Sequence, residues 1–331
     1  MDRRRFVLRS AEALAGLGIA GCGGRLVKGT TPVASAASPV SRSPDEPLYR
    51  VSLAQWSLHR TLRGGELDAL EFPAFARRRF DIDAVEYVNQ FFMDRASDGR
   101  YIGELKRRAD DAGVRSLLIM CDELGRLGDP DPDARHTAVE NHHPWVGAAA
   151  TLGCHSIRVN AASEGPPEEA AALAADGLYR LTTYAADHGL DVIVENHGGL
   201  SSNGRWLAGV IRRVDHPRCG TLPDFGNFTL DDGTEYDRYR GVQEMMPFAR
   251  AVSAKSYAFD EAGEETTIDY RRMMRIVVDV GYHGHLGIEY EGDQLSEVDG
   301  ILATRELLLR VRDELELEAA RSPELGNAGA G

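Results

Sequence analysis

Eight short apolar segments recur along this chain, and each is followed by a longer segment with the spacing of an amphipathic helix. The starts of the apolar segments lie 28 to 41 residues apart, which is the length of one strand–helix unit. They are residues 49–55, 84–88, 115–121, 156–160, 191–195, 219–224, 251–257 and 286–290. Eight such units predict an α/β chain that closes into a single (β/α)₈ barrel. An open doubly wound sheet is the rival fold, but no GxGxxG motif follows the first segment.

The N-terminus has the features of an export signal. An arginine pair, one further residue, Phe6 and an apolar stretch over residues 11–20 resemble a twin-arginine signal. The stretch ends in Ile-Ala-Gly followed by Cys22, which resembles a lipobox. We expect export by the twin-arginine route and a lipid on Cys22 that anchors the protein at the periplasmic or cell-surface side of a membrane. A basic N-terminus with a chance cysteine is the alternative.

Composition divides the rest of the chain. Residues 1–21 are predicted to be the signal peptide, and residues 22–47, rich in Gly, Ser, Ala and Pro, a flexible tether. Residues 48–320 hold the barrel, and residues 321–331 are predicted to be a disordered tail. The four cysteines include no CxxC pair, which excludes a zinc ribbon and a disulfide-stapled small domain.

The charge balance restricts the partners. The 331 residues carry 38 basic and 52 acidic side chains, a net charge of −14. An acidic surface repels phosphate backbones, so nucleic acid is not an expected partner, whereas metal ions and neutral or cationic ligands are. The balance leaves open a local basic pocket for a phosphorylated ligand, and it leaves open a homo-oligomer.

Three acids end apolar segments on late strands. Glu195, Asp224 and Glu289 stand 29 and 65 residues apart, which is one and two strand–helix units. Active sites of such barrels lie at the carboxyl ends of the strands, so these acids should converge. Three converging carboxylates repel one another, and a divalent cation would relieve the repulsion. Taken singly, each acid could instead cap a helix, and Glu291 could replace Glu289 because it points the same way.

Other polar or aromatic residues near strand ends are candidates for substrate binding. His197 is assigned first to substrate contact, with metal ligation and rim stacking as alternatives. Trp56 could form an apolar wall for a sugar ring, or it could be an ordinary core residue. The full set of candidates is His197, Lys255, Asn160, Arg158, Glu86, His59, Trp56 and Asn227.

Several segments carry a resemblance to a known family. They include Val-Ile-Val-Glu195-Asn-His, Leu-Pro-Asp224-Phe-Gly-Asn and Gly-Ile-Glu289-Tyr-Glu, in this order and at barrel spacing. In these segments the chain resembles the sugar phosphate isomerase/epimerase family, whose fold is the xylose isomerase-like TIM barrel, over roughly residues 49–315.

The resemblance implies a divalent metal ion, Mn²⁺, Mg²⁺ or Zn²⁺. The family holds it with Glu on strand 5, Asp on strand 6, His or Gln on strand 7 and Glu on strand 8. Glu195, Asp224 and Glu289 match the first, second and fourth ligands. The strand-7 position, two residues before Lys255, is Ser253 here. The site would then have three protein ligands plus water, or His197 or Asp260 would substitute.

The resemblance also implies a reaction on a small carbohydrate. A metal-dependent isomerase or epimerase would use Glu195 and Glu289 as the two proton-transfer groups through a cis-enediolate, with Lys255 stabilising its oxygen. A lyase acting on 3-keto-glycosides from the same first step is one alternative, and a non-catalytic sugar-binding lipoprotein is another. An endonuclease of this barrel type would need more histidines than the ten present and a basic groove.

Overall fold

The computed structural model describes residues 46–327, with side chains up to Arg321. The predicted signal peptide, Cys22 and nearly all of the predicted tether lie outside the described residues, so those assignments stay predictions. The last helix continues to Asn327, into the segment for which the sequence predicts a tail. None of the helices in residues 46–327 combines the length and the apolar composition that a membrane span requires.

Eight parallel strands form one sheet in the order β6-β5-β4-β3-β2-β1-β8-β7. The two end strands meet as well, because parallel bridges join Thr221 to Ala249 and Asp224 to Ser253. The barrel is therefore closed, as the spacing of the apolar segments predicts. The strands are β1 Arg50–Ala54, β2 Ala84–Val88, β3 Arg115–Met120, β4 Ser156–Asn160, β5 Asp191–Glu195, β6 Cys219–Leu222, β7 Val252–Ser256 and β8 His285–Tyr290.

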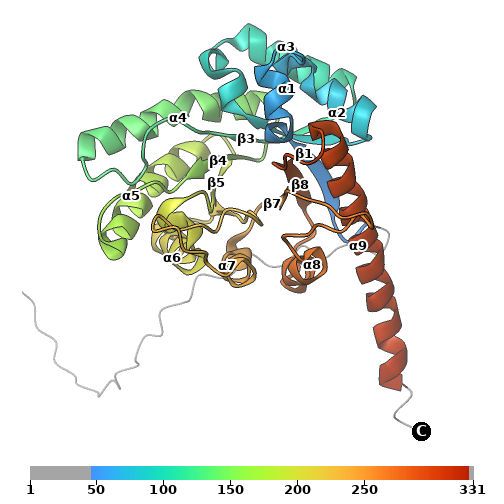
Figure 1. The fold of residues 1–331 in the computed structure, drawn as a ribbon. Helices are drawn as coiled ribbons and strands as arrows, with labels where there is room; N and C mark the ends of the chain where they lie inside the picture. Colours follow the sequence, from blue (N-terminus) through green and yellow to red (C-terminus); the bar gives the residue numbers. More distant parts are fainter. Residues whose placement is uncertain (1–45, 328–331) are drawn as a thin grey trace, which may run out of the picture. The chain divides into compact units, whose positions relative to one another are not determined.

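Helices surround the strands (Figure 1). They begin and end where the sequence provides caps: Asp98 and Asp131 accept hydrogen bonds from the first turns of α3 and α4, and Gly153 ends α4 with a φ of 79°. The described helices are α1 His59–Arg63, α2 Phe72–Phe80, α3 Gly99–Asp111, α4 Pro132–Leu152, α5 Pro167–Ala186, α6 Gly204–Val214, α7 Arg238–Met245, α8 Tyr270–Asp279 and α9 Glu297–Asn327.

The strand boundaries agree with the sequence prediction within one or two residues. β6 is the shortest, since it ends at Leu222 rather than at the predicted residue 224. Pro223 follows it and has no amide hydrogen to donate, so the regular ladder stops there. Asp224 is left in an irregular segment at the mouth of the barrel, where its side chain is free to turn inward.

The barrel interior changes character along its axis. An apolar cluster of Ala54, Val88, Leu118, Met120, Ile193, Leu222 and Ala251 fills much of it. Charged side chains gather at the carboxyl ends of the strands, where Glu195, Asp224, Lys255 and Glu289 are all buried. A larger apolar core lies between the strands and the helices. The packed interior closes the barrel from below and leaves the carboxyl end for chemistry.

Candidate active site and metal centre

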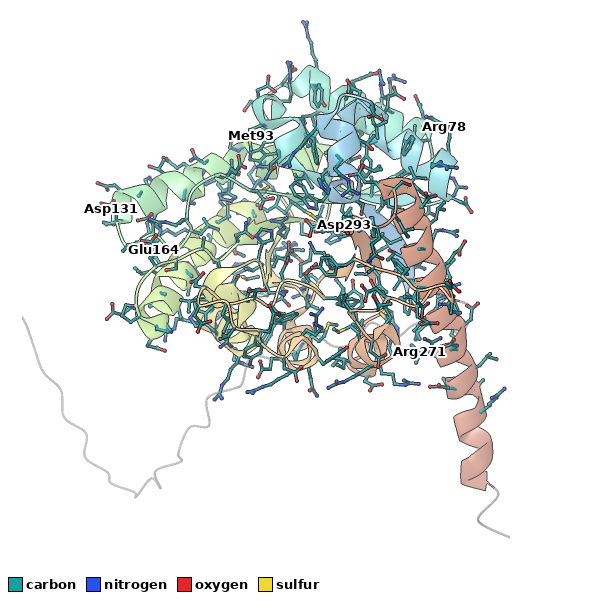
Figure 2. All side chains as sticks on the ribbon, viewed as in Figure 1. Arg78, Met93, Asp131, Glu164, Arg271 and Asp293 are labelled. Carbon is teal, nitrogen blue, oxygen red and sulfur yellow. The ribbon has the colours of Figure 1, made fainter. Side chains whose placement is uncertain are left out.

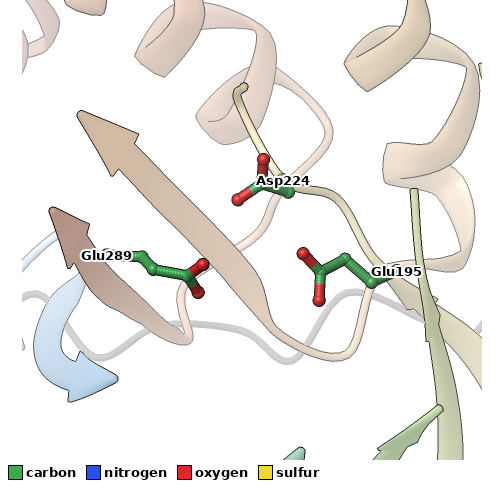
Figure 3. A group of neighbouring side chains, drawn as sticks. All are labelled: Glu195, Asp224 and Glu289. Carbon is green, nitrogen blue, oxygen red and sulfur yellow. The ribbon is translucent and has the colours of Figure 1, made fainter. Parts of the chain in front are cut away.

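Three carboxylates from the ends of three strands lie close together (Figure 3). Glu195 is the last residue of β5, Asp224 follows β6 by two residues, and Glu289 is the next-to-last residue of β8. One oxygen from each lies within 4.8 Å of the others, and the residues are only 1%, 0% and 4% exposed. The barrel geometry thus brings together the three acids that the sequence singled out.

Most oxygens of the first two acids are already held. Asn227 donates to Glu195 Oε1 at 2.9 Å, and the backbone amides of Gly226 and Asn227 donate to Asp224 Oδ1 at 2.8 and 2.9 Å. Glu195 Oε2 lies 2.8 Å from Arg158 Nε, but this contact lacks hydrogen-bond geometry. Among the described residues, Oε2 is therefore a buried oxygen without a hydrogen bond.

Lys255 holds the third acid. Its Nζ donates to Glu289 Oε1 at 2.5 Å and to Glu291 Oε2 at 2.8 Å. Ser253 Oγ donates to Asp224 Oδ2 at 2.6 Å and lies 3.4 Å from Glu289 Oε2. Lys255 thus holds Glu289 Oε1, whereas Glu289 Oε2 has only the long contact with Ser253.

Burial makes the negative charges costly. It raises the pKa of Glu195 well above its usual range, although the Arg158 charge opposes the shift. It also raises the pKa of Asp224 to about 6, against the pull of Lys255. Burial alone would lower the pKa of Lys255, but Glu289 and the other acids outweigh it and hold that pKa well above its usual value.

This donor set fits a divalent metal ion. Three buried carboxylates that repel one another, one of them with an unbonded oxygen, are stabilised by a doubly charged cation. Among the described residues, the group that could hold an ion contains these three acids and no nitrogen or sulfur ligand. An oxygen-only set suits Mg²⁺ and Mn²⁺.

Neither suggested substitute for the strand-7 ligand joins this group. His197 belongs to the cavity wall, and Asp260 accepts hydrogen bonds from the amides of Ala262 and Glu264 in its own loop. Ser253 occupies the strand-7 position, and its hydroxyl orients Asp224.

A cavity of about 350 Å³ opens above the acids. Its size is at the small end of the range for small-molecule sites. Glu195 and Asp224 lie beneath its wall. The wall is formed by Trp56, Val88, Gln90, Asp122, Glu123, Arg158, Asn160, His197, Asn227, Lys255, Glu289 and Glu291.

Six of the eight proposed substrate contacts line this cavity, and two do not. Glu86 is mid-strand in β2, one layer deeper, where Ser52 donates to it at 2.6 Å. Burial raises its pKa to about 7, and Gly287 leaves room for it, since a Cβ there would lie 2.5 Å from Glu86 Oε2. The ring of His59 stacks on the ring of Trp56, with 5.0 Å between the ring centroids, and supports it instead of facing the cavity.

Three acids of the wall, Asp122, Glu123 and Glu291, were not predicted to contact the substrate. Asp122 lies two residues after the end of β3, where it accepts hydrogen bonds from Arg158 at 2.6 Å and from Asn160 at 2.8 Å. Glu291 accepts hydrogen bonds from Lys255 and from the Trp56 indole. Their sequence signal was the same as for the metal triad: an acid at the end of a strand.

The family assignment follows from a match over most of the barrel. Residues 76–313 match the family described as the xylose isomerase-like TIM barrel, which is well over half of the chain. The chain belongs to this family. The family match covers all the strands except β1, and it includes the metal triad and most of the cavity wall.

Two relatives match short stretches of this family member. It is 33% identical over 79 residues to the 3′-dehydrocarminate deglycosidase alpha subunit of a Microbacterium species, 23% of either chain. It is 43% identical over 49 residues to the C-glycoside deglycosidase alpha subunit of Arthrobacter globiformis, 15% of this chain and 13% of that one. The chain spans less than a quarter of the length of the relatives it matches.

Solved structures share the fold more completely. A xylose isomerase-like TIM barrel protein from Mycobacterium smegmatis in complex with magnesium has a TM-score of 0.62 at 16% identity, covering 80% of this chain and 96% of that one. An L-ribulose 3-epimerase has a TM-score of 0.63 at 15% identity, covering 86% and 99%. At these identities the likeness shows a common fold.

Proposed function

We propose that the protein is a metal-dependent enzyme that transfers a proton at a carbon next to the keto group of a sugar, as an isomerase or epimerase. The observation that carries the proposal is the placement of two buried glutamates, Glu195 and Glu289, on either side of Asp224 below one cavity (Figure 3). The fold of an L-ribulose 3-epimerase supports it.

The bound divalent ion would polarise the keto oxygen and so acidify the neighbouring C–H bond. Glu195 has a buried oxygen without a hydrogen bond, which suits it to accept that proton. Glu289 approaches from β8, on the far side of the cluster, and suits the return of a proton to carbon. Return to the opposite face of the same carbon gives an epimer, and return to the neighbouring carbon gives an isomer.

A second candidate begins with the same proton removal. On a 3-keto-glycoside, loss of the group at the anomeric carbon would follow, and the enzyme would be a lyase. The two deglycosidase alpha subunits favour this candidate, because each of them shares a stretch of sequence with this chain.

The test is solvent exchange in deuterated water with the Mn²⁺- or Mg²⁺-loaded protein and a panel of keto-sugars and 3-keto-glycosides. We expect deuterium at the carbon next to the keto group. A shifted keto group or an inverted centre identifies the isomerase or epimerase, and release of an aglycone identifies the lyase. Binding of sugars without exchange in the loaded protein would contradict both candidates and leave a sugar-binding protein.

A further inference from the structure

The two cations in the cavity wall are both neutralised by acids. Arg158 lies 2.6 Å from Asp122 and 2.8 Å from Glu195, and it is 4% exposed. Lys255 lies 2.5 Å from Glu289 and 2.8 Å from Glu291, and it is 2% exposed. Each cation is fixed between two carboxylates, so neither has charge or geometry to spare for an anionic substrate group.

Acids outnumber these cations around the cavity. Asp122, Glu123, Glu195, Asp224, Glu289 and Glu291 lie in its wall or directly beneath it. With Arg158, Lys255 and one divalent ion in place, six carboxylates still leave two negative charges. The field in a cavity with low-dielectric walls then repels an anion before it can dock.

Glu123 adds to this field at the edge of the cavity. It is exposed, and the described part of the chain gives it no ion pair or hydrogen bond. Its backbone φ of 61° lies in the left-handed region, which a residue with a Cβ rarely adopts. Such strained positions cluster at functional sites, where the surrounding structure fixes a side chain in place.

The loops that often bind phosphate in these barrels are acidic here. In many (β/α)₈ enzymes a phosphate sits between the loops after strands 7 and 8. Residues 257–269, after β7, contain five acids and no Lys or Arg. Residues 291–296, after β8, contain Glu291 and Asp293 and again no Lys or Arg. Figure 2 labels Asp293 in this loop.

We infer that the cavity takes an uncharged carbohydrate and rejects the corresponding sugar phosphate or sugar acid. The inference rests on the proposed function for its claim that the ligand is a sugar. Arg63 is a cation beside the cavity that a charged substrate could use. It is exposed beside the cavity, lies 4.8 Å over the Trp56 ring and donates to Gln90 at 2.9 Å, without a carboxylate partner in the described part.

The experiment measures dissociation constants by calorimetry on the Mn²⁺-loaded full chain, with matched pairs of ligands. The pairs are D-fructose with D-fructose 6-phosphate, D-ribulose with D-ribulose 5-phosphate, and a methyl 3-keto-glucoside with its uronate. We expect each charged member to bind roughly tenfold more weakly or worse than its partner, and added salt to narrow the gap. Equal or tighter binding of a charged member would overturn the inference, as would failure of every uncharged member to bind at millimolar concentration.

A charge variant sharpens this result. Glu123→Lys should lower the ratio of the two dissociation constants at least threefold, because it reverses an unpaired charge at the cavity edge. Asp279→Lys makes the same charge change at the exposed C-terminal end of α8, away from the cavity, and should leave the ratio unchanged. An unchanged ratio in Glu123→Lys, or a phosphate affinity abolished by Arg63→Gln, would contradict the proposed charge exclusion.

The two proposals fail in different ways. If uncharged sugars bind selectively but no proton exchanges, the proposed function fails and the charge exclusion stands. If exchange occurs on a sugar phosphate as fast as on its uncharged partner, the proposed function stands and the charge exclusion fails.

Discussion

Charged pairs occur in two very different regions of this molecule. On the outer helices, Lys106 and Asp110 form a pair whose side chains are 40% and 60% exposed. Inside the mouth of the barrel, Arg158 and Glu195 are 4% and 1% exposed, and the acids exceed the cations. Outside, water screens the charges and they contribute little; inside, burial makes each charge costly unless a partner compensates it. The excess of buried acid at the mouth of the barrel should therefore lower the free energy of unfolding unless a cation binds there.

The largest effect is expected from the interior glutamates. Glu195→Gln and Glu289→Gln keep the side-chain shape and one oxygen that can ligate the metal, but they remove the base. Proton exchange should therefore fall by about 10²–10⁴-fold in either variant. The measurement is the deuterium exchange rate with the best substrate and saturating metal. Glu306→Gln, exposed on α9, is the matched control and should exchange at the wild-type rate. A loss of less than threefold in both interior variants would mean that neither glutamate transfers the proton.

Breaking an interior pair should cost stability. Arg158→Met removes the positive charge between Asp122 and Glu195 and leaves both carboxylates uncompensated. Removal of one partner of a buried pair typically lowers the free energy of unfolding by about 3–5 kcal/mol. Urea unfolding at neutral pH, without metal, measures the change. A loss below about 1 kcal/mol would show that solvent reaches these charges and that the contrast with the outer helices is overstated.

A buried histidine in the helical layer tests whether burial itself sets the energetics. His142 is 2% exposed and lies 2.7 Å from the Ala138 carbonyl, and burial lowers its pKa to about 4. The pKa of His142 in the folded protein lies below the unfolded value of about 6.5. The contribution of the neutral imidazole to the free energy of unfolding is therefore complete above pH 6.5 and is lost as the pH falls toward 4. Between pH 7 and 4.5, the wild type should lose about 2–3 kcal/mol more than His142→Gln. Parallel pH curves from urea unfolding would argue that the imidazole is not held neutral.

Metal binding should restore part of the stability that the buried carboxylates cost. An ion that binds only the folded protein, at 100 times its Kd, stabilises it by about 2.7 kcal/mol. Thermal unfolding with Mn²⁺ and with chelator measures this shift. Asp224→Asn should lose most of it, since the variant removes one of three carboxylates and part of the attraction for the ion. The same shift in Asp224→Asn would place the ion elsewhere.

The sequence predicted the fold and the acids better than the contacts between them. Strand spacing located all eight strands, because buried parallel strands are continuous apolar runs. It also brought Glu195, Asp224 and Glu289 together. The sequence predicted Glu86 as a substrate contact, but this residue lies below the cavity. Its depth in the barrel depends on the stagger of the strands, which the local sequence pattern does not encode.

The sequence also could not predict contacts between side chains on different strands of the barrel. Lys255 pairs with Glu289 and Glu291 across 34 and 36 residues, and no periodicity in one segment encodes such a pair. The charge balance of the cavity depends on these pairings. The sequence therefore left open a phosphate pocket that the structure argues against.

The smallest effect should come from the outer helices. Lys106→Met removes an i,i+4 pair in which Nζ lies 2.8 Å from Asp110, yet we expect at most about 0.5 kcal/mol of lost stability. Three reasons apply: both groups are exposed, lysine preceding the acid is the weaker order on a helix, and methionine keeps a helix propensity close to that of lysine. In 1 M salt, where the screening length is about 3 Å, this difference should vanish while that of Arg158→Met persists. Urea unfolding of both variants at low and at high salt measures these losses of stability. If salt removed the loss in Arg158→Met as fully as it removes the loss in Lys106→Met, the interior charges would be as well screened as those outside.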